Sequence, residues 1–448
     1  MPERSNNIER VKQFLANSLE QAKPLLKHLH PSDIAAILED VSPETRKRII
    51  RLLPVETASE AIVEMDEESR PEELLMQLTP SQAAKIIEEL DPDDAADLLA
   101  QIPLKDLRQI MARLEDEDTK QIQQLMTYDE ESAGGIMTPE VLKVPDNFSK
   151  REAMDEVLRI SDEMEDFYVI YVVDENDVLL GTVSINDLIR AKPWTKVREL
   201  IDEDCVKVHV DTDQEEVARM ISKYNLAAIP VVDSNGRLLG HITFDDVMDV
   251  LEEESTEDIL RIAGVSEDEE LRGSWRNAVK SRLPWLLVNL LTAFVAGLVI
   301  SSFSDTIDKI VIIASFMPIV AGVAGNSATQ ALAVTIRRIS TDRVNAKQNF
   351  RVIFKELIVG LVNGLLLGAI TGTAAFFLGG NPMLGLVVFL AMVGNLLIGA
   401  FAGSAIPLFL NKMDIDPAVA SSILMTALTD ILGFTLLLGL ATLILDLG

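Results

Sequence analysis

The chain has 448 residues, with 71 acidic against 40 basic residues, a formal net charge of −31 and a hydrophobic content of 48%. Such an acid excess argues against a nucleic-acid-binding protein, because phosphate would be repelled over most of the surface. One cysteine excludes an intramolecular disulfide and a cysteine-based zinc site, and four histidines make a transition-metal site a poor first choice.

The first part of the chain contains an internal repeat with a period of 49 residues. HPSDIAAILEDVSPETRKRIIRLLP (residues 30–54) aligns with TPSQAAKIIEELDPDDAADLLAQIP (residues 79–103). Each copy has two short amphipathic stretches opened by proline, which is favoured at the first position of a helix. Stacked helix pairs of this kind form a superhelical solenoid, which we expect over residues 1–129.

A second repeat follows, in which VVDENDVLLGTVSINDL (residues 172–188) matches VVDSNGRLLGHITFDDV (residues 231–247) at an offset of 59. Each copy reads as an extended run, an amphipathic helix, an apolar strand, a turn, a second strand and a second helix. This order predicts a small α+β unit that occurs twice, over about 137–201 and 202–250 within residues 130–250.

The last part of the chain is electrically balanced and apolar, since 63 of the acids and 32 of the basic residues lie before residue 284. Five segments there are long enough to cross the ~30 Å hydrocarbon layer of a membrane. They cover residues 284–303, 310–336, 357–378, 384–410 and 418–445. The sequence therefore predicts an all-α membrane domain of five transmembrane helices over residues 284–448, joined to the soluble part by an acidic connecting helix and linker over residues 251–283.

Basic residues near the spans predict the orientation in the membrane. Six of them occupy the loop between the second and third spans, whereas the loops after the first and third spans carry one and none. Because cytoplasmic loops are enriched in Lys and Arg, residues 1–283 are expected in the cytoplasm and the C-terminus outside. The N-terminal Met-Pro-Glu-Arg shows no apolar segment of a signal peptide.

Polar residues follow one face of the second and the fifth predicted spans. The positions are Pro318, Gly322, Gly325, Asn326 and Thr329, and then Ser422, Thr426, Thr429, Asp430 and Gly433. Close helix packing through small residues is one interpretation of the glycines. Asp430 is the only acid well inside any of these predicted spans. An ionised carboxylate there costs about 2.5–3.5 kcal/mol, so we expect it to face a water-filled cavity and a cation.

Dense acid clusters mark the soluble part, at Asp91, Asp93, Asp94 and Asp97 and again from Asp245 to Asp258. A solvated helix face is one interpretation. However, like charges four residues apart on a helix are destabilising, and here they recur in two separate domains. Oxygen-rich clusters select hard cations such as Mg²⁺ or Ca²⁺, and no EF-hand spacing is present. Several weak Mg²⁺-like sites between domains therefore fit better than one tight Ca²⁺ site.

The VVD…LLG…(S/T)xxD pattern of the second repeat resembles a tandem pair of CBS domains, which are regulatory modules that often bind adenine nucleotides. The resemblance implies a nucleotide site at Ser184 and Asp187, with ATP as a modulator, and corresponding positions at Thr243 and Asp246. The alternative is that these residues only cap helices, because the same spacing suits an N-terminal cap.

The whole order of domains resembles the MgtE family of magnesium channels. PIVAGVAGNSATQ (residues 318–330) is similar to the family's P-x-x-x-G-x-x-G-N-x-x-x-Q signature, and DPAVASS (416–422) with TALTDILG (426–433) is similar to its fifth-span pore motif. The resemblance implies a homodimeric, Mg²⁺-selective channel or transporter that takes up Mg²⁺ across the cytoplasmic membrane and is closed by cytosolic Mg²⁺.

Site residues follow from the same resemblance. The pore ligands implied are Asp430, Asn326, Ser422 and Thr426. The regulatory Mg²⁺ ligands implied are Asp91, Asp93, Asp94, Asp97, Asp246, Asp249, Glu253, Glu254, Glu257 and Asp258. This chain has Ser422 where some members have Asn, and Asn225 where some have a regulatory Asp.

Two other classes of function are alternatives. A coupled secondary transporter for Co²⁺ or Mn²⁺ is disfavoured because no His, Cys or Met ligand lies at Asp430. A membrane-anchored sensor or enzyme is disfavoured because the sequence has no P-loop, nucleophile elbow or Cys–His pair, and we therefore expect no enzymatic reaction.

Overall fold

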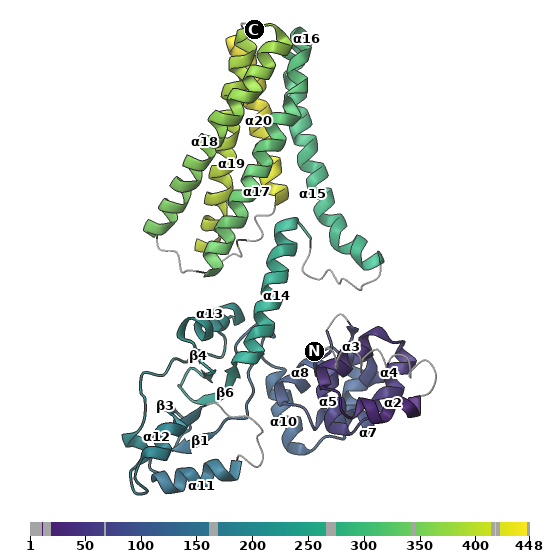
Figure 1. Cartoon of the computed structure of the whole chain (residues 1–448), viewed down its shortest axis with the longest axis vertical. Coiled ribbons are helices and arrows are strands. Elements are labelled where there is room, and N and C mark those ends of the chain that lie inside the picture. Colours follow the sequence, from purple (N-terminus) through teal and green to yellow (C-terminus); the bar gives the residue numbers. More distant parts are fainter. Residues whose placement is uncertain are drawn as a thin grey trace. The chain divides into compact units, whose positions relative to one another are not determined.

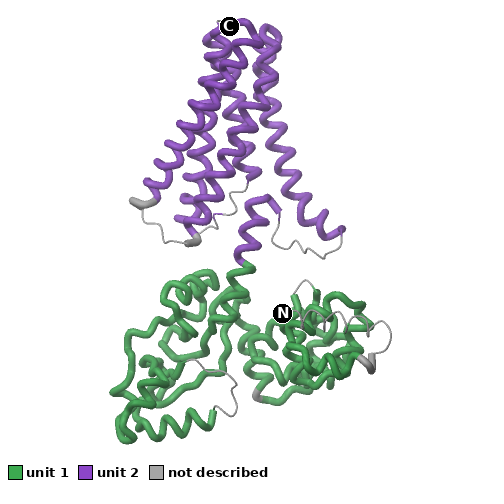
Figure 2. The backbone as a smooth tube through the Cα atoms, in the orientation of Figure 1, with its two compact units in different colours: residues 1–253 green, residues 254–448 purple. Residues whose placement is uncertain are grey.

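The computed structural model describes residues 11, 19–66, 69–160, 169–265, 275–341, 346–413, 417 and 422–445. The chain forms two compact units, residues 1–253 and 254–448 (Figures 1 and 2). The linker at 266–274 and most of the residues just before α20, 414–416 and 418–421, lie outside the described residues, as do the predictions made for them.

The N-terminal part of the first unit is a stack of short helices, as the 49-residue repeat predicts. Proline occupies the start of α3, α4, α6, α7 and α8, where its missing N–H has no helical partner to lose. Helix α3 packs with α5, α5 with α7 and α7 with α9, so alternate helices form one continuous layer. The helices are α2 (Leu19–Leu26), α3 (Pro31–Asp40), α4 (Pro43–Ile50), α5 (Val55–Val63), α6 (Pro71–Gln77), α7 (Pro80–Ile87), α8 (Pro92–Ala100), α9 (Leu104–Met111) and α10 (Asp116–Leu125).

Two small α+β units follow, each with a three-stranded sheet. In both sheets the first strand pairs parallel to the second and the second pairs antiparallel to the third, with orders β1-β2-β3 and β4-β5-β6. The first unit contains β1 (Lys143–Pro145), α11 (Lys150–Ile160), β2 (Ile170–Val173), β3 (Leu179–Val183), α12 (Ile185–Arg190) and the 3-10 helix η2 (Val197–Glu199). The second contains β4 (Val208–His209), α13 (Gln214–Tyr224), β5 (Ala228–Val232), β6 (Leu238–Thr243) and the start of α14 (Phe244–Ala263). The predicted tandem repeat is confirmed.

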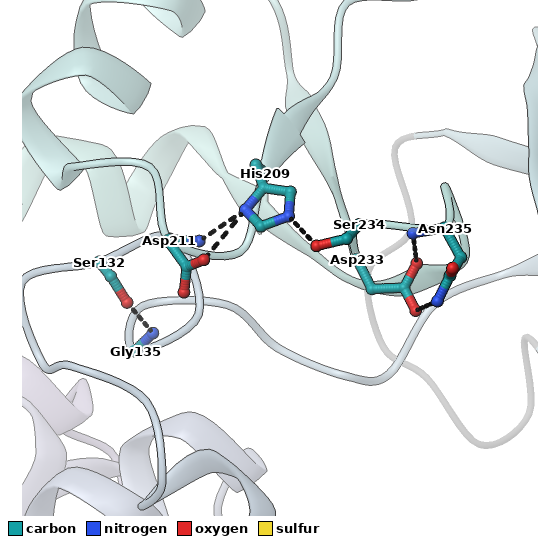
Figure 3. Close-up of polar contacts among 7 residues, drawn as sticks. All are labelled: Ser132, Gly135, His209, Asp211, Asp233, Ser234 and Asn235. Carbon is teal, nitrogen blue, oxygen red and sulfur yellow. Dashed lines mark hydrogen bonds and ion pairs between the residues drawn. The ribbon is translucent and has the colours of Figure 1, made fainter.

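The turns of the two hairpins lie against each other. Leu179 N donates to Gly236 O at 2.9 Å, and Leu238 N donates to Asp177 O at 2.9 Å. Asp177 and Gly236 have positive φ angles of 60° and 79°, as tight turns require. Figure 3 shows how His209 holds the second turn, since its Nε2 lies 3.0 Å from Ser234 Oγ. The two repeats therefore form one joined pair.

The second unit is a helical bundle with five helices that are long and apolar enough to cross a membrane. Its elements beyond α14 are α15 (Trp275–Ser302), α16 (Ser304–Lys309), the 3-10 helix η3 (Val311–Ser315), α17 (Met317–Thr341), α18 (Ala346–Gly379), α19 (Pro382–Lys412) and α20 (Ser422–Ile444). Small residues bring α18 close to α19: a Cβ at Gly364 would lie 3.0 Å from Val393 Cα, and one at Gly372 would lie 2.7 Å from Gly385 O. Such contacts are typical of membrane helices, where packing replaces the hydrophobic effect.

The third predicted span, residues 357–378, lies within the longer helix α18. This helix is continuous from Ala346, and its segment of membrane length covers Asn349–Gly379. Glu356 therefore lies in the same helix, beside the predicted start of the span, and it is only 7% exposed. Its Oε1 lies 3.2 Å from Lys355 Nζ. A carboxylate with an adjacent ammonium group is tolerated near the end of a membrane helix.

Candidate functional site

The acids at the start of α8 face the acids at the start of α14, within the first unit. Burial raises the pKa of Asp93 well above its ordinary value, and the charges of Asp94 and Asp246 raise it further. Burial also raises the pKa of Asp94, to about 7, with Asp91, Asp246, Asp97 and Asp249 adding to the effect. The structure thus brings together the two clusters that are 150 residues apart in the sequence. We call Asp91, Asp93, Asp94, Asp97, Asp246 and Asp249 the α8–α14 acid cluster.

The carboxylates of this cluster are unfavourably placed, first because they are buried and then because their like charges repel one another. Asp93 is 9% exposed, and its Oδ1 has no hydrogen-bond partner among the described residues. The pKa values of Asp246 and Asp249 are raised, chiefly by burial. An unpaired buried carboxylate is costly, and each neighbour of the same sign adds to that cost. Cations that bind here would therefore remove repulsion as well as form new contacts.

The cluster is too open to be a preformed metal cage. Across the described parts of the chain, no three His, Cys, Asp or Glu side chains converge as direct ligands of one ion. Mg²⁺ keeps several of its waters and binds through one or two carboxylates, so it can bridge facing acids through its hydration shell. This arrangement suits the weak, hydrated binding that the sequence predicts.

Glu64 is a member of this region that sequence reasoning missed. Its charge helps to raise the pKa of Asp249, behind burial and Asp246. Glu64 follows the last residue of α5, beyond the aligned residues 30–54 of the first repeat copy, and it opens an acid-rich stretch, EMDEESRPEE (residues 64–73). The sequence analysis did not use that stretch, and nothing in the stretch indicates which distant acids Glu64 approaches.

The remaining predicted regulatory acids lie further along α14. Glu253 is exposed at the end of the first unit, whereas Glu254, Glu257 and Asp258 are partly buried and belong to the second. Glu257 forms an ion pair with Arg261, one turn later on the same helix. Glu257 therefore has a basic partner that the sequence analysis did not consider.

Beyond these acids, the end of α14 contacts the start of α20 within the second unit. Ile262 packs against a cluster that contains Met425 and Leu332. Gly264 has a φ of 74°, and a Cβ built there would lie 3.1 Å from Ile423 Cγ1. Ile423 follows Ser422, one of the predicted pore residues. The connecting helix thus ends beside the first turn of α20.

The predicted pore residues lie on two helices that approach closely. A Cβ at Gly325 of α17 would lie 3.5 Å from Thr429 Oγ1 and 3.7 Å from Thr426 Oγ1 of α20. Asn326 and Thr426 are exposed, and Ser422 and Asp430 are partly buried, whereas Gly325 and Thr429 are buried where the two helices approach. The polar faces of the second and fifth spans are therefore brought together, as an ion path between them requires.

The predicted nucleotide residues cap helices in this structure. Ser184 Oγ donates to Asp187 Oδ2 at 2.7 Å, and Asp187 N donates to Ser184 Oγ at 3.1 Å. Thr243 and Asp246 repeat the arrangement, with Thr243 Oγ1 donating to Asp246 Oδ2 at 2.6 Å. Ser184 and Asp187 are exposed, so capping leaves their outer faces accessible. These residues form helix caps, and both nucleotide binding and an exclusively capping role stay predictions.

The raised pKa values predict that the first unit becomes less stable as the pH rises. Asp94 has a folded-state pKa of about 7 against an ordinary value of 3.8. Its protonated form therefore stabilises the fold below pH 4, and this contribution is lost as the pH rises through 7. For Asp94 alone the free energy of unfolding should fall by on the order of 4 kcal/mol across that window.

Urea unfolding of residues 1–253 in EDTA, at pH 5 and pH 7.5, measures this loss. Carboxylates with lowered pKa values, such as Asp174 and Asp233, titrate below this window and do not mask it. Asp94→Asn should flatten the pH dependence, whereas the exposed control Asp204→Asn should leave it unchanged. Equal stability of the unsubstituted fragment at both pH values would contradict the prediction.

Comparison with known proteins agrees with this architecture. A model of the MgtE divalent cation transporters matches residues 317–440, one of the MgtE intracellular N domain matches residues 29–131, and one of CBS domains matches residues 133–193 and 197–253. The chain is 33% identical over 450 residues to the magnesium transporter MgtE of Thermus thermophilus, covering 97% of this chain and 100% of that protein. It is 36% identical over 320 residues to the magnesium transporter MgtE of Bacillus subtilis, covering 71% of each.

Solved structures resemble the soluble part. The cytosolic domain of the Mg²⁺ channel MgtE in complex with ATP is 35% identical, with a TM-score of 0.50, and covers 53% of this chain and 97% of that one. The soluble part of a magnesium transporter is 28% identical, with a TM-score of 0.51, and covers 56% of this chain and 99% of that one. Sequence similarity and domain order agree along nearly the whole chain, which belongs to the MgtE family of divalent cation transporters.

Proposed function

We propose that this protein is a Mg²⁺-selective channel or transporter that takes up Mg²⁺ and is closed by Mg²⁺ on its cytosolic side. The observation that carries the proposal is the α8–α14 acid cluster, with its buried and unpartnered Asp93, in a chain whose membrane domain holds Asp430. The names of the relatives, which are magnesium transporters, favour Mg²⁺ over Co²⁺ or Mn²⁺.

In the membrane domain, Asp430, Asn326, Ser422 and Thr426 hold hydrated Mg²⁺. The support is the close approach of α17 to α20 at Gly325, together with the accessibility of polar side chains on both helices. A carboxylate, an amide and hydroxyl groups are oxygen ligands of the kind that Mg²⁺ prefers. Asp430 supplies the charge, and the neutral groups accept hydrogen bonds from the waters of the ion.

In the cytosolic part, the regulatory ions occupy the α8–α14 acid cluster, with Glu253, Glu254, Glu257 and Asp258 as further ligands along α14. At low Mg²⁺ the repulsion between α8 and α14 favours a looser state. At high Mg²⁺ the ions bridge the two helices and favour a compact state. An ion that binds one of two states more tightly shifts the equilibrium toward it, which makes Mg²⁺ both substrate and switch.

Several finer features belong to the same proposal. The domains are residues 1–129, 130–250, 251–283 and 284–448, and two copies of the chain form a homodimer. Residues 1–283 are cytosolic and the C-terminus is outside, which the basic loop after α17 supports. ATP acts as a modulator at Ser184 and Asp187, supported by the ATP complex of a similar cytosolic domain. The protein catalyses no enzymatic reaction.

The test is ion flux into liposomes with Mg²⁺ varied independently on the two sides. Purified protein should let external Mg²⁺ enter at a rate that falls as Mg²⁺ on the side of residues 1–283 rises into the millimolar range. Flux recorded with and without a pH or Na⁺ gradient separates a channel from a coupled transporter. Flux of Co²⁺ or Mn²⁺ without flux of Mg²⁺ would overturn the proposal.

A further inference from the structure

Asn395 is an unusual residue in the middle of α19, the most apolar of the five membrane-length helices. Its side chain is 0% exposed, so it contacts neither solvent nor lipid. Its Nδ2 donates to Val320 O of α17 at 3.2 Å. Its Oδ1 has no hydrogen-bond partner among the described residues. A buried amide with an unpaired oxygen is destabilising, and a leucine of similar size would avoid that cost.

The other side of the Asn395 amide is pressed against Gly433 of α20. A Cβ built at Gly433 would overlap Asn395 Nδ2 and lie 2.8 Å from Cγ and 3.0 Å from Oδ1. No side chain fits between them, so the glycine and the amide define the distance between α19 and α20 at this level. Asn395 is thus joined to α17 by a hydrogen bond and to α20 by direct contact.

Gly433 lies three residues after Asp430, and residues three apart share a face of a helix. The Asn395 amide therefore contacts α20 within one turn of the proposed pore carboxylate. On α17, Val320 precedes Asn326 by less than two turns. The contact between Gly325 and Thr429 lies along the same pair of helices. Asn395 of α19 does not belong to the polar faces of α17 and α20, but its contacts with both helices set the spacing between those faces.

We propose that Asn395 is a positioning residue of the ion path. Its amide fixes α17 against α20, and so sets the spacing at which Asp430 and Asn326 accept hydrated Mg²⁺ and discriminate against the larger Ca²⁺. This inference rests on the proposed function, because it concerns the same ion path. Asn395 itself touches no ion.

The experiment uses full-length protein in liposomes and measures Mg²⁺ and Ca²⁺ flux for Asn395→Ala, Gly433→Ala and the double variant. Gly433→Ala alone places a methyl group onto the amide and should lower Mg²⁺ flux by about tenfold, equivalent to about 1.4 kcal/mol. In the Asn395→Ala background the methyl group has room, so adding Gly433→Ala should change flux by no more than about twofold. Gly439→Ala is the matched control on α20, because a Cβ there meets no atom within 4 Å.

The selectivity for Mg²⁺ over Ca²⁺ distinguishes a positioning role of Asn395 from a role in helix packing alone. Asn395→Ala should raise the half-saturating Mg²⁺ concentration and lower the ratio of Mg²⁺ to Ca²⁺ flux several-fold, while the melting temperature of the purified protein stays within a few degrees. Asn395→Ser, which keeps a hydrogen-bond donor, should recover part of the ratio. Asn395→Leu is a second variant for the case in which the alanine protein does not fold. Its half-saturating Mg²⁺ concentration, ratio of Mg²⁺ to Ca²⁺ flux and melting temperature are measured in the same way.

Two results would overturn the inference. One is an equal loss of flux from Gly433→Ala in both backgrounds. The other is a melting temperature and maximal flux that fall together while half-saturation and the ion ratio stay fixed, which would make Asn395 a packing residue only. If the unsubstituted protein carries no Mg²⁺ in these liposomes, the proposed function fails and this inference fails with it. If the unsubstituted protein does carry Mg²⁺ and either of the first two results is obtained, only this inference fails and the proposed function stands.

Discussion

Replacing Asp430 with alanine is expected to reduce Mg²⁺ flux by about 100-fold or more while leaving expression and membrane insertion intact. The reason is that removing an intramembrane carboxylate lowers the cost of insertion by about 2.5–3.5 kcal/mol but also removes the charge that holds a divalent cation. Asp430→Asn tests the charge separately, because hydrated Mg²⁺ can still donate hydrogen bonds to an amide oxygen. Flux of Mg²⁺ into liposomes measures both.

Glu356→Gln is the control for this prediction. Glu356 is also a carboxylate within a membrane-length helix, but it is 7% exposed and has Lys355 beside it. If the position of Asp430 on the polar face of α20 matters, the glutamine at 356 should leave most of the flux. Flux at the unsubstituted rate in Asp430→Ala would remove this residue from the pore.

Replacing Asp93, Asp97, Asp246 and Asp249 with asparagine is expected to make the cytosolic part compact without Mg²⁺ and to bias the channel toward its closed state. Two unit charges ~4 Å apart repel by about 1 kcal/mol in water and by ~4 kcal/mol at an effective dielectric constant near 20. In the α8–α14 acid cluster, several acids raise one another's pKa values through their charge. Neutral amides remove that repulsion, so the substituted protein should need no bridging ion.

Limited proteolysis between residues 125 and 140, where the helical stack joins the first CBS unit, measures compaction. In the unsubstituted protein, cleavage should slow in millimolar Mg²⁺ but not in KCl of equal ionic strength, because monovalent salt screens charge without bridging. The substituted protein should be cleaved slowly in both. A matched control changes four exposed acids outside the cluster, Glu44, Glu115, Glu175 and Asp204, to their amides. Equal protection by Mg²⁺ and KCl would contradict specific bridging.

The architecture could be read from the sequence because its signals are local and repeated. Proline at the start of successive helices, the duplicated hairpin with its Asn-Asp and Asn-Gly turns, and five long apolar segments each specify an element without reference to distant residues. Asp430 could be identified for the same reason, since an acid in an apolar helix stands out wherever the helix packs. The two acid clusters approach each other within one unit, since the charge of Asp246 raises the pKa of Asp93. That these acids hold Mg²⁺ stays a prediction.

Contacts between distant elements could not be predicted in this way. Glu64 becomes relevant only when the solenoid stacks α5 beside α14. Asn395 is a single polar residue without a pattern, and its importance depends on the backbone of Gly433 and the carbonyl of Val320. Helix α18 extends back past Glu356 and Lys355, which the apolar run that begins at residue 357 does not indicate. Each depends on three-dimensional packing that no sequence period records.

The cap at the start of α14 gives Asp246 two tasks that compete. Its Oδ2 accepts hydrogen bonds from Thr243 N at 3.1 Å and from Thr243 Oγ1 at 2.6 Å, and these bonds begin the helix. The same carboxylate faces Asp93 and Asp94 of α8. An ion that draws Asp246 toward α8 must therefore do so through Oδ1, or else loosen the first turn of α14. The affinity of the proposed cation site therefore depends on the stability of the first turn of α14. A substitution of Thr243, which is not itself a proposed ligand, should change the Mg²⁺ concentration at which the protein responds.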